Sequence, residues 1–373
     1  MQSGEKMIEF IRKNTVMVIA FVAAVVTSLI IPPDIKYIEY FDVKTLVCLF
    51  CVLAVVCALK NINFFYILAK KVVTVFKNAR MAILALVYIT FIGSMLIAND
   101  MALLTFLPLG YFVLKATKSE KYMAFTFIMQ NIAANLGGML TPFGNPQNLY
   151  LYSVYNIPNM EFIKIMAPPF VVSVALITFC CTAILKKEPL ILKDEKVDLN
   201  IPKTALYLAL FTLSILIVFR GVPYAIGLVV IPIVLFFADR KALRDVDYPL
   251  LLTFVFFFVF AGNMARIEIV RNFFSFLLQK STLLFSILSC QIISNVPSAI
   301  LLSQFTENYP DLLVGVNIGG TGTVIASLAS LITFKEYLRH NPGKSRYYLG
   351  MFTFYNFGFL ILLTVFMLIY KMI

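Results

Sequence analysis

Two segments of the chain interrupt long apolar runs with the same set of small and polar residues. Asn135-Leu-Gly-Gly-Met-Leu-Thr141 matches Asn317-Ile-Gly-Gly-Thr-Gly-Thr323 at the Asn, at both glycines and at the final Thr. Paired glycines allow a helix to break inside a membrane, where the break must line a cavity. The break exposes carbonyls, which can hold a cation, and amides, which can hold an anion. The pattern therefore predicts two broken transmembrane helices that together bind an ion and a polar or anionic solute.

A polar tip between two apolar runs precedes each glycine segment. The first tip is Asn99-Asp100, and the second is Ser294-Asn295-Val296-Pro297. Each run beside the second tip would reach only about 17 Å as a helix, whereas a membrane core is about 30 Å thick. Each pair of runs is either one kinked span or a re-entrant hairpin. The distribution of basic residues favours two re-entrant helical hairpins, 81–114 and 282–306.

Asp100 is the only acidic residue that this arrangement places well inside the membrane. Ionisable residues at such depth are costly and usually functional. Asp100 could carry a coupling proton or balance the charge of a bound Na⁺. The alternative is that it caps the helix that starts at Met101, because a carboxylate suits exposed helix amides. The two interpretations do not exclude each other.

The composition indicates the kind of elements that position these residues. Of the 373 residues, 61% are apolar and only 13% are charged, which is typical of a polytopic membrane protein. At roughly 20 residues per span, this apolar content corresponds to about 11 spans. The net charge of +12 does not indicate a nucleic-acid partner, because the basic residues fall between the apolar runs, as in membrane proteins. A single His argues against a His-rich metal site and a Ser-His-Asp triad, so we expect neither an enzyme nor a metal other than Na⁺.

The order of segments repeats along the chain as span, interfacial helix, hairpin, broken span and span. The first repeat is predicted at 1–203, with the broken helix at 122–155 and a cytoplasmic linker at 186–203. The second is predicted at 204–373, with the broken helix at 310–334. Interrupted apolar segments at 62–77 and 265–280 are expected to lie at the membrane interface.

The basic residues also predict how the repeats are oriented. Lys and Arg collect in cytoplasmic loops, and most of them fall on one side if the N-terminus is cytoplasmic and both pairs of runs are hairpins. The first hairpin then opens from the cytoplasm and the second from outside. This is an inverted-topology repeat, an architecture in which the binding site lies near the bilayer midplane between the repeats.

At these residues the sequence resembles the ion transporter superfamily, which includes arsenite permeases, sodium–proton antiporters of the same fold and divalent anion–sodium symporters. The resemblance lies in the following strings: Ala98-Asn99-Asp100-Met101-Ala102 with Pro108, Thr141-Pro-Phe-Gly-Asn-Pro-Gln-Asn148, Ser294-Asn295-Val296-Pro297-Ser298, and Asn317 to Thr323. The first tip is similar to that of the arsenite-permease branch. The dicarboxylate branch carries Ser-Asn-Thr at both tips, so the resemblance is closest to small arsenite-permease-like anion permeases.

The resemblance implies roles for individual residues. By position, one cation site would be formed by Asn99, Asp100, Gly137, Gly138 and Thr141. Its pseudo-symmetric partner would be formed by Asn295, Gly319, Gly320 and Thr323. Substrate contacts are expected at Asn145, Asn148, Ser298 and Ser327. Members of the superfamily are often dimeric, which implies a homodimer.

These observations predict a secondary active transporter in the cytoplasmic (inner) membrane that moves a small inorganic or organic anion by alternating access. Transport would be coupled to Na⁺ or H⁺, with no other cofactor, and the partners would be the small anionic solute and the lipid bilayer. A sodium–proton antiporter of the same fold is the nearest alternative. A channel and an enzyme of the membrane interior are further alternatives, but Asp100 alone does not provide the two carboxylates that such an enzyme would need.

Overall fold

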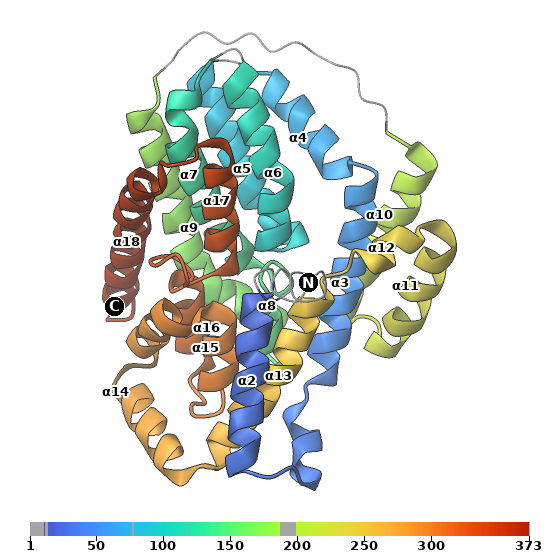
Figure 1. Ribbon diagram of the computed structural model, residues 1–373, viewed down its shortest axis with the longest axis vertical. Helices are drawn as coiled ribbons and strands as arrows, with labels where there is room; N and C mark the ends of the chain where they lie inside the picture. The colour runs from blue at the N-terminus through green and yellow to red at the C-terminus, as the bar shows by residue number, and fades with distance from the viewer. Residues whose placement is uncertain (1–10, 12–13, 77, 117, 187–198, 373) are drawn as a thin grey trace, which may run out of the picture.

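The protein is built entirely from helices in the part of the chain that the structure describes. The computed structural model describes residue 11 and residues 14–76, 78–116, 118–186 and 199–372, and within these ranges there is no strand (Figure 1). Among these residues, seven helices are long and apolar enough to cross a membrane. The expectation of an all-α polytopic membrane protein is confirmed.

The helices of the first part of the chain are α2 (Thr15–Ile30), η1 (Ile35–Tyr40), α3 (Val43–Asn61), α4 (Phe64–Thr74), α5 (Ala79–Ile97), α6 (Asn99–Ala116), η2 (Glu120–Tyr122), α7 (Met123–Gly137), η3 (Gly138–Leu140), α8 (Pro146–Val154) and α9 (Asn159–Ile184). Those of the second part are α10 (Ile201–Val218), α11 (Tyr224–Ala238), α12 (Arg240–Arg244), α13 (Tyr248–Arg266), α14 (Glu268–Ile293), α15 (Asn295–Leu302), α16 (Tyr309–Ile318), α17 (Leu328–His340) and α18 (Ser345–Tyr370).

Helices α5 and α6 form the first hairpin, and α7 packs against both of its arms. The chain reverses at Ala98, which has a φ of 63°, in the left-handed region that L residues rarely adopt. Helix α7 ends at Gly137, the short turn η3 follows, and α8 begins only at Pro146. A proline at the first helical position suits this restart because its missing N–H would have no partner there. The helix predicted at 122–155 is therefore broken at its glycine pair.

The second half repeats this arrangement. Helix α14 bends at Ser281, whose backbone is extended (φ −167°, ψ 99°), so its first half is separate from the hairpin arm that follows. The chain reverses at Ser294, with a φ of 75°, and α15 returns. Helix α16 ends at Ile318, directly before the second glycine pair, and α17 begins at Leu328.

One predicted boundary differs from the structure. The broken helix predicted to end at residue 334 continues as α17 to His340. The apolar run stops before Lys335, but the helix continues through Glu336 and His340, whose side chains pair one turn apart at 3.0 Å. Hydropathy marks the end of the apolar surface and not the end of the helix.

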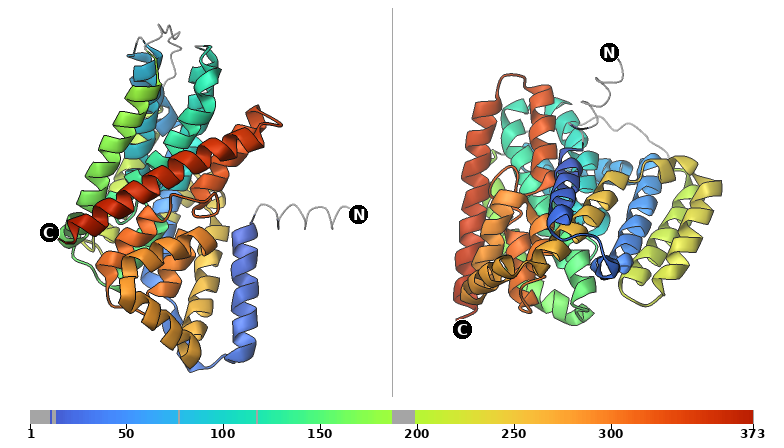
Figure 2. Two further views of the ribbon diagram at one scale, coloured as in Figure 1. Left: turned by 90° about the vertical axis from the view of Figure 1, so that its left-hand side faces the viewer. Right: turned by 60° about the horizontal axis from the view of Figure 1, so that its bottom comes forward.

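The two hairpins enter from opposite ends of the molecule. In Figure 1, α5, α6 and α7 occupy the upper part and α14, α15 and α16 the lower part, and Figure 2 shows the same separation from the side. The tips at Asn99 and Asn295 meet in the middle, where both line one cavity. This is the inverted pair of hairpins and broken helices expected from the sequence. The repeat boundaries at 203 and 204 stay a prediction, and most of the linker 186–203 lies outside the described residues.

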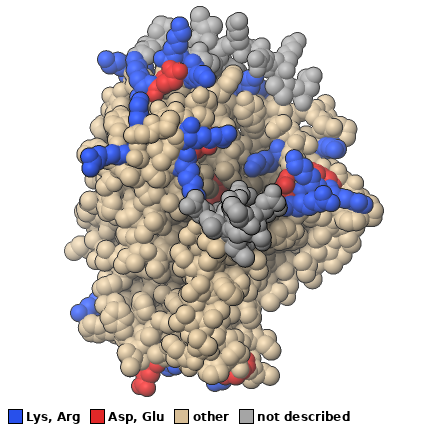
Figure 3. Space-filling view, viewed as in Figure 1, with Lys and Arg blue, Asp and Glu red and all other residues tan. Residues whose placement is uncertain are grey.

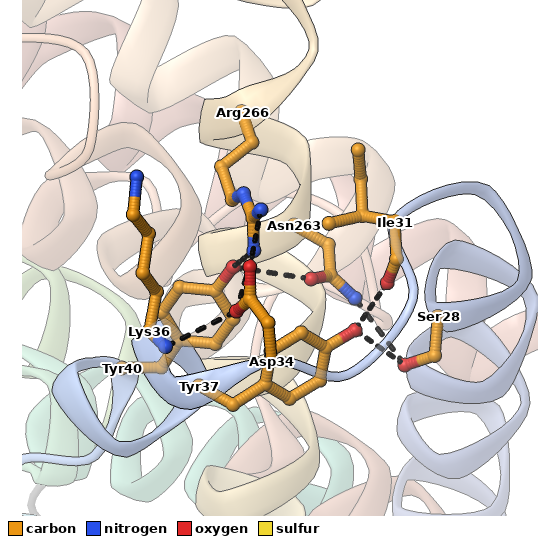
Figure 4. Close-up of polar contacts among 8 residues, drawn as sticks. All are labelled: Ser28, Ile31, Asp34, Lys36, Tyr37, Tyr40, Asn263 and Arg266. Atoms are coloured by element: carbon orange, nitrogen blue, oxygen red, sulfur yellow. Dashed lines mark hydrogen bonds and ion pairs between the residues drawn. The ribbon is translucent and has the colours of Figure 1, made fainter.

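A polar cluster fastens α2 and η1 to the end of α13 (Figure 4). The guanidinium of Arg266 donates to both carboxylate oxygens of Asp34, at 3.0 and 2.7 Å, and to the hydroxyl of Tyr40. The amide of Asn263 donates to the hydroxyls of Thr27 and Ser28. Because the Arg266 guanidinium donates to it, the pKa of Asp34 lies below its ordinary value of 3.8. The cluster holds α2 beside α13, two helices that are far apart in the sequence.

Candidate functional site

The tips of both hairpins face a single cavity of about 150 Å³. The side chains around it come from the starts of α2, α6, α8, α13 and α15 and from one face of α17. In Figure 3 this face of the molecule is hollowed near its centre, with acidic surface visible inside the hollow and basic side chains beside it. The cavity wall includes Asn99, Asp100, Gln147, Asp247, Asn295, Leu328 and Lys335.

Four of the helices that begin at this cavity belong to the hairpins and to the breaks. Helices α6 and α15 start at Asn99 and Asn295, the two hairpin tips, and α8 and α17 start at Pro146 and Leu328, after the two breaks. Each helix N-terminus carries a partial positive charge and leaves backbone amides without helical partners. The arrangement therefore gives the cavity a positive potential that comes from the backbone.

Asp100 lies in the first turn of α6 and lines the cavity. Its Oδ1 atom is buried, and no described residue donates a hydrogen bond to it. The backbone amide of Asp100 is instead capped by Oδ1 of Asn99 at 2.9 Å. The structure thus gives the capping role to Asn99 and leaves the Asp100 carboxylate facing the cavity.

The two tips are held by equivalent hydrogen bonds. The backbone amide of Asn99 donates to the carbonyl of Gly144 at 3.2 Å, and that of Asn295 donates to the carbonyl of Ala326 at 2.9 Å. Asn295 also accepts from the following amide, that of Val296, as Asn99 does from Asp100. The repeats differ at this following residue, because Val296 stands where the first tip has Asp100.

Thr141 and Thr323 connect the breaks to the hairpins. The hydroxyl of Thr141 donates to the carbonyl of Met95 at 2.7 Å, and that of Thr323 donates to the carbonyl of Gln291 at 3.1 Å. Met95 and Gln291 lie in the last turns of the first arms, α5 and α14. Each threonine therefore ties its break to the first arm of its own hairpin, at corresponding positions of the two repeats.

The glycine pairs lie where each break packs closely against neighbouring segments of its own repeat. A Cβ atom at Gly137 would meet the carbonyl oxygen of Phe91 and lie 2.7 Å from Oγ of Ser94. A Cβ atom at Gly319 would lie 2.8 Å from Cβ of Cys290 on α14. Gly138 and Gly320 similarly face Asn145 and Asn295. Glycine lets each break approach its hairpin closely, which brings the polar tips to the cavity.

Asn145 and Asn148 meet the second repeat at Asn317. Nδ2 of Asn145 donates to Oδ1 of Asn317 at 3.0 Å, and Nδ2 of Asn317 donates to Oδ1 of Asn148 at 2.6 Å. All three side chains are at most 1% exposed. They join the two breaks directly and lie behind the cavity wall rather than on it. Their role as substrate contacts stays a prediction.

Ser298 and Ser327 are also buried away from the cavity wall. The hydroxyl of Ser298 is 2.8 Å from that of Ser289, between the two arms of the second hairpin. Oγ of Ser327 accepts from the backbone amide of Ser330 at 3.2 Å and so caps α17. Their role toward a substrate likewise stays a prediction.

Most residues of the cavity wall were not among the predicted site residues, and among them Gln147, Asp247 and Lys335 carry polar or charged side chains. Gln147 lies inside the string Thr141 to Asn148, so the motif itself could have indicated it. Asp247 directly precedes one apolar run and Lys335 directly follows another, so hydropathy alone does not distinguish them from ordinary loop charges. No group of three or more His, Cys, Asp or Glu side chains that could hold a metal ion occurs among the described residues.

A family model described as "Citrate transporter" matches residues 5–310, which is most of the chain. The chain belongs to the citrate transporter family. An uncharacterized transporter of the archaeon Methanocaldococcus jannaschii is 34% identical over 296 residues, covering 78% of this chain and 80% of the relative. An inner membrane protein of Escherichia coli, YbiR, is 28% identical over 283 residues, covering 73% of this chain and 74% of the relative.

The family confirms the resemblance to the ion transporter superfamily. The chain is therefore an integral membrane transporter of the citrate transporter family, and its match spans the first hairpin, the first break and the second hairpin. The family and the name of the archaeal relative describe transporters, not enzymes.

Proposed function

We propose that this member of the citrate transporter family moves a small anion across the membrane by alternating access, coupled to Na⁺ or H⁺. The observation that carries the proposal is the convergence of four helix N-termini, those of α6, α8, α15 and α17, on one cavity. The aligned peptide dipoles of these helices favour a negatively charged solute. Neutral amides of Asn99 and Asn295 at the same wall supply further hydrogen bonds.

The Asp100 carboxylate supplies the reason for coupling. An ionised carboxylate in the cavity opposes the entry of an anion, since like charges repel most strongly where little water screens them. A proton or Na⁺ at Asp100 removes this repulsion, so the cation binds before the anion and the two travel together. Because the anion enters only after the cation has neutralised Asp100, the flux of the anion is coupled to the flux of the cation.

The cavity volume favours a small solute. A cavity of about 150 Å³ is comparable to one that holds benzene. An inorganic oxyanion or a small carboxylate fits such a space, whereas a citrate-sized anion requires the hairpins to move apart. The family description names citrate, but the tip residues Asp100 and Val296 differ from the Ser-Asn-Thr tips of dicarboxylate carriers.

The cavity opens among basic residues. Lys335 lines its wall, and Arg240, Lys241 and Arg244 of α12 lie just before the cavity residue Asp247. Since basic residues collect on the cytoplasmic side, we assign the N-terminus to the cytoplasm of an inner-membrane protein and the structure to an inward-facing state. A homodimer is part of this proposal.

A binding screen tests the proposal. Purified protein is heated with arsenite, phosphate, acetate or citrate, each with and without Na⁺ and at two pH values. A ligand at 100 times its Kd stabilises the folded state by about 2.7 kcal/mol. We expect one anion to raise Tm, and only when Na⁺ is present or the pH is low. Sodium-driven proton movement in proteoliposomes without any added anion would instead support the antiporter.

A further inference from the structure

We propose that the coupling cation binds at the cavity floor, between the carboxylate of Asp100 and the side-chain oxygen of Gln147, and not in the two helix breaks. The inference rests on the proposed cation-coupled transport and deepens it by naming the ligands. It depends on which oxygen atoms of the site already have hydrogen-bond donors and which do not.

Three carbonyls of the first break already accept a hydrogen bond from one buried side chain. Nδ2 of Asn148 donates to the carbonyls of Gly138, Met139 and Thr141 at 3.2 to 3.3 Å. Asn148 is fully buried. Its amide group therefore stands where a cation held by these carbonyls would have to lie.

Two carbonyls of the second break accept hydrogen bonds in the same way from Gln291 of α14. Its Nε2 donates to the carbonyls of Gly319 and Thr321 at 2.8 and 3.1 Å. Its Oε1 accepts from the backbone amide of Thr323 at 2.9 Å. A cation in this break would have to displace an amide that is bonded at both ends, which costs the hydrogen bonds it makes.

The orientation of Gln147 follows from a chain of fixed donors. Nδ2 of Asn317 donates to the backbone carbonyl of Leu313 at 2.8 Å, and a carbonyl can only accept. Oδ1 of Asn317 must therefore accept, and it does so from Nδ2 of Asn145 and from Nε2 of Gln147, at 3.0 and 3.4 Å. This leaves Oε1 of Gln147 as the free end of the side chain. That atom is buried and has no donor among the described residues. Oδ1 of Asn145 likewise has none, but Asn145 does not line the cavity and Gln147 does.

Asp100 and Gln147 line the same cavity, and the charged residues Asp247 of α13 and Lys335 of α17 face it as well. The segments of Asp100 and Gln147 touch, because the amide of Asn99 donates to the carbonyl of Gly144, three residues before Gln147. Gln147 is only 1% exposed, and both side chains present an acceptor without a donor. Such a pair repels an anion and favours Na⁺, which prefers oxygen ligands, or a proton that is shared by the two oxygens.

The experiment measures cation binding without any anion, so that it does not depend on the substrate. Binding of ²²Na⁺ and proton uptake after a pH change are recorded on the purified full chain. We expect one cation per protein, lost in Asp100→Asn and bound at least tenfold more weakly in Gln147→Met. Gln291 of the second hairpin corresponds to Met95 of the first. The variant Gln291→Met should therefore still bind the cation. Gln130→Met is the matched control, since Oε1 of Gln130 is also buried without a donor but lies away from the cavity.

The ²²Na⁺ and proton measurements show which cation is bound. Unchanged binding in Gln147→Met, a second cation in the wild type, or loss of the cation in Gln291→Met at an unchanged Tm would overturn the inference. In those cases coupled transport by the wild type would still support the proposed function. If Gln291→Met does not fold, cation binding by Asp100→Asn and Gln147→Met still tests whether these two residues hold the cation. The proposed function fails separately, if transport by the wild type depends on neither cation.

Discussion

Oδ1 of Asn317 lies 3.0 Å from Nδ2 of Asn145, although 172 positions separate the two residues in the sequence. This hydrogen bond joins the break of one repeat to the break of the other inside a wall from which water is excluded. Buried polar networks of this kind are rigid when every member has a partner and costly when one is lost. The hydrogen bond therefore couples the two breaks to each other, and the hairpin tips line the cavity beside them.

The first prediction concerns this bond. Asn145→Ala and Asn317→Ala should each lower the free energy of unfolding by about 1 to 3 kcal/mol, because each leaves buried partners without a hydrogen bond. A double-mutant cycle should give a coupling energy of about 1 kcal/mol or more. The pair Asn61 and Asp239, hydrogen-bonded at 3.1 Å in a more exposed place, serves as the control and should couple less. Additive effects for Asn145 and Asn317 would contradict the prediction.

The second prediction concerns Asp100. Asp100→Asn removes the charge that the coupling cation neutralises, so uptake driven by a Na⁺ or pH gradient in proteoliposomes should fall at least tenfold, and the remaining flux should not depend on pH or Na⁺. The fold should be unaffected, because among the described residues no donor reaches Oδ1 of Asp100. Asp245→Asn, at an exposed residue outside the cavity wall, is the control. Uptake that keeps its ion dependence in Asp100→Asn would exclude this role.

The third prediction concerns the first glycine pair. In Gly137→Ala the new methyl group would press on the carbonyl of Phe91, so stability should fall by about 1 to 3 kcal/mol. In Gly350→Ala, within α18, a Cβ atom meets nothing within 4 Å. That variant should gain about 0.5 to 1 kcal/mol, since Ala is the better helix former. Thermal unfolding of both variants measures the contrast, and equal Tm values would refute the close approach at Gly137.

The fourth prediction concerns Lys335, an exposed basic residue on the cavity wall. Lys335→Gln should raise KM for the anion by roughly 3- to 10-fold with little change in kcat, because a charge at the entrance acts mainly on capture. The effect should shrink at high ionic strength. Lys344→Gln, on the same side but outside the cavity wall, should leave KM unchanged. A change confined to kcat would place Lys335 in a different role.

The fifth prediction concerns Asp34 and Arg266. Hydrogen bonds from Arg266 lower the pKa of Asp34, so the folded state binds its proton less readily than the unfolded state does. The ion pair therefore stabilises the fold above the ordinary carboxyl pKa of 3.8, and this stabilisation is lost as the pH falls through the lowered value. Asp34→Asn should reduce Tm slightly at neutral pH and make no difference at the acidic end. A constant difference across the pH range would exclude the ion pair as its cause.

Much of the architecture followed from local patterns. Apolar runs separated by charged loops predicted the helices, and the polar tips at Asn99 and Asn295 marked the turns of the hairpins. The paired glycines at Gly137 and Gly319 marked the breaks. Each of these signals acts within one or two helical turns, because it reflects backbone freedom and the cost of placing polar groups in hydrocarbon. A hydropathy pattern cannot end a helix, however, which is why α17 ran past its predicted end to His340.

What the tertiary structure decided is the direction of side chains and their partners. The sequence placed Asp100 at the site but did not predict that Asn99 would cap α6 and leave the carboxylate free. It placed Asn145 and Asn148 beside the break, but only the packing of the two repeats turned them toward Asn317 and left Gln147 at the cavity. A side chain one position along a helix turns by about 100°, so its role depends on which distant element packs against it.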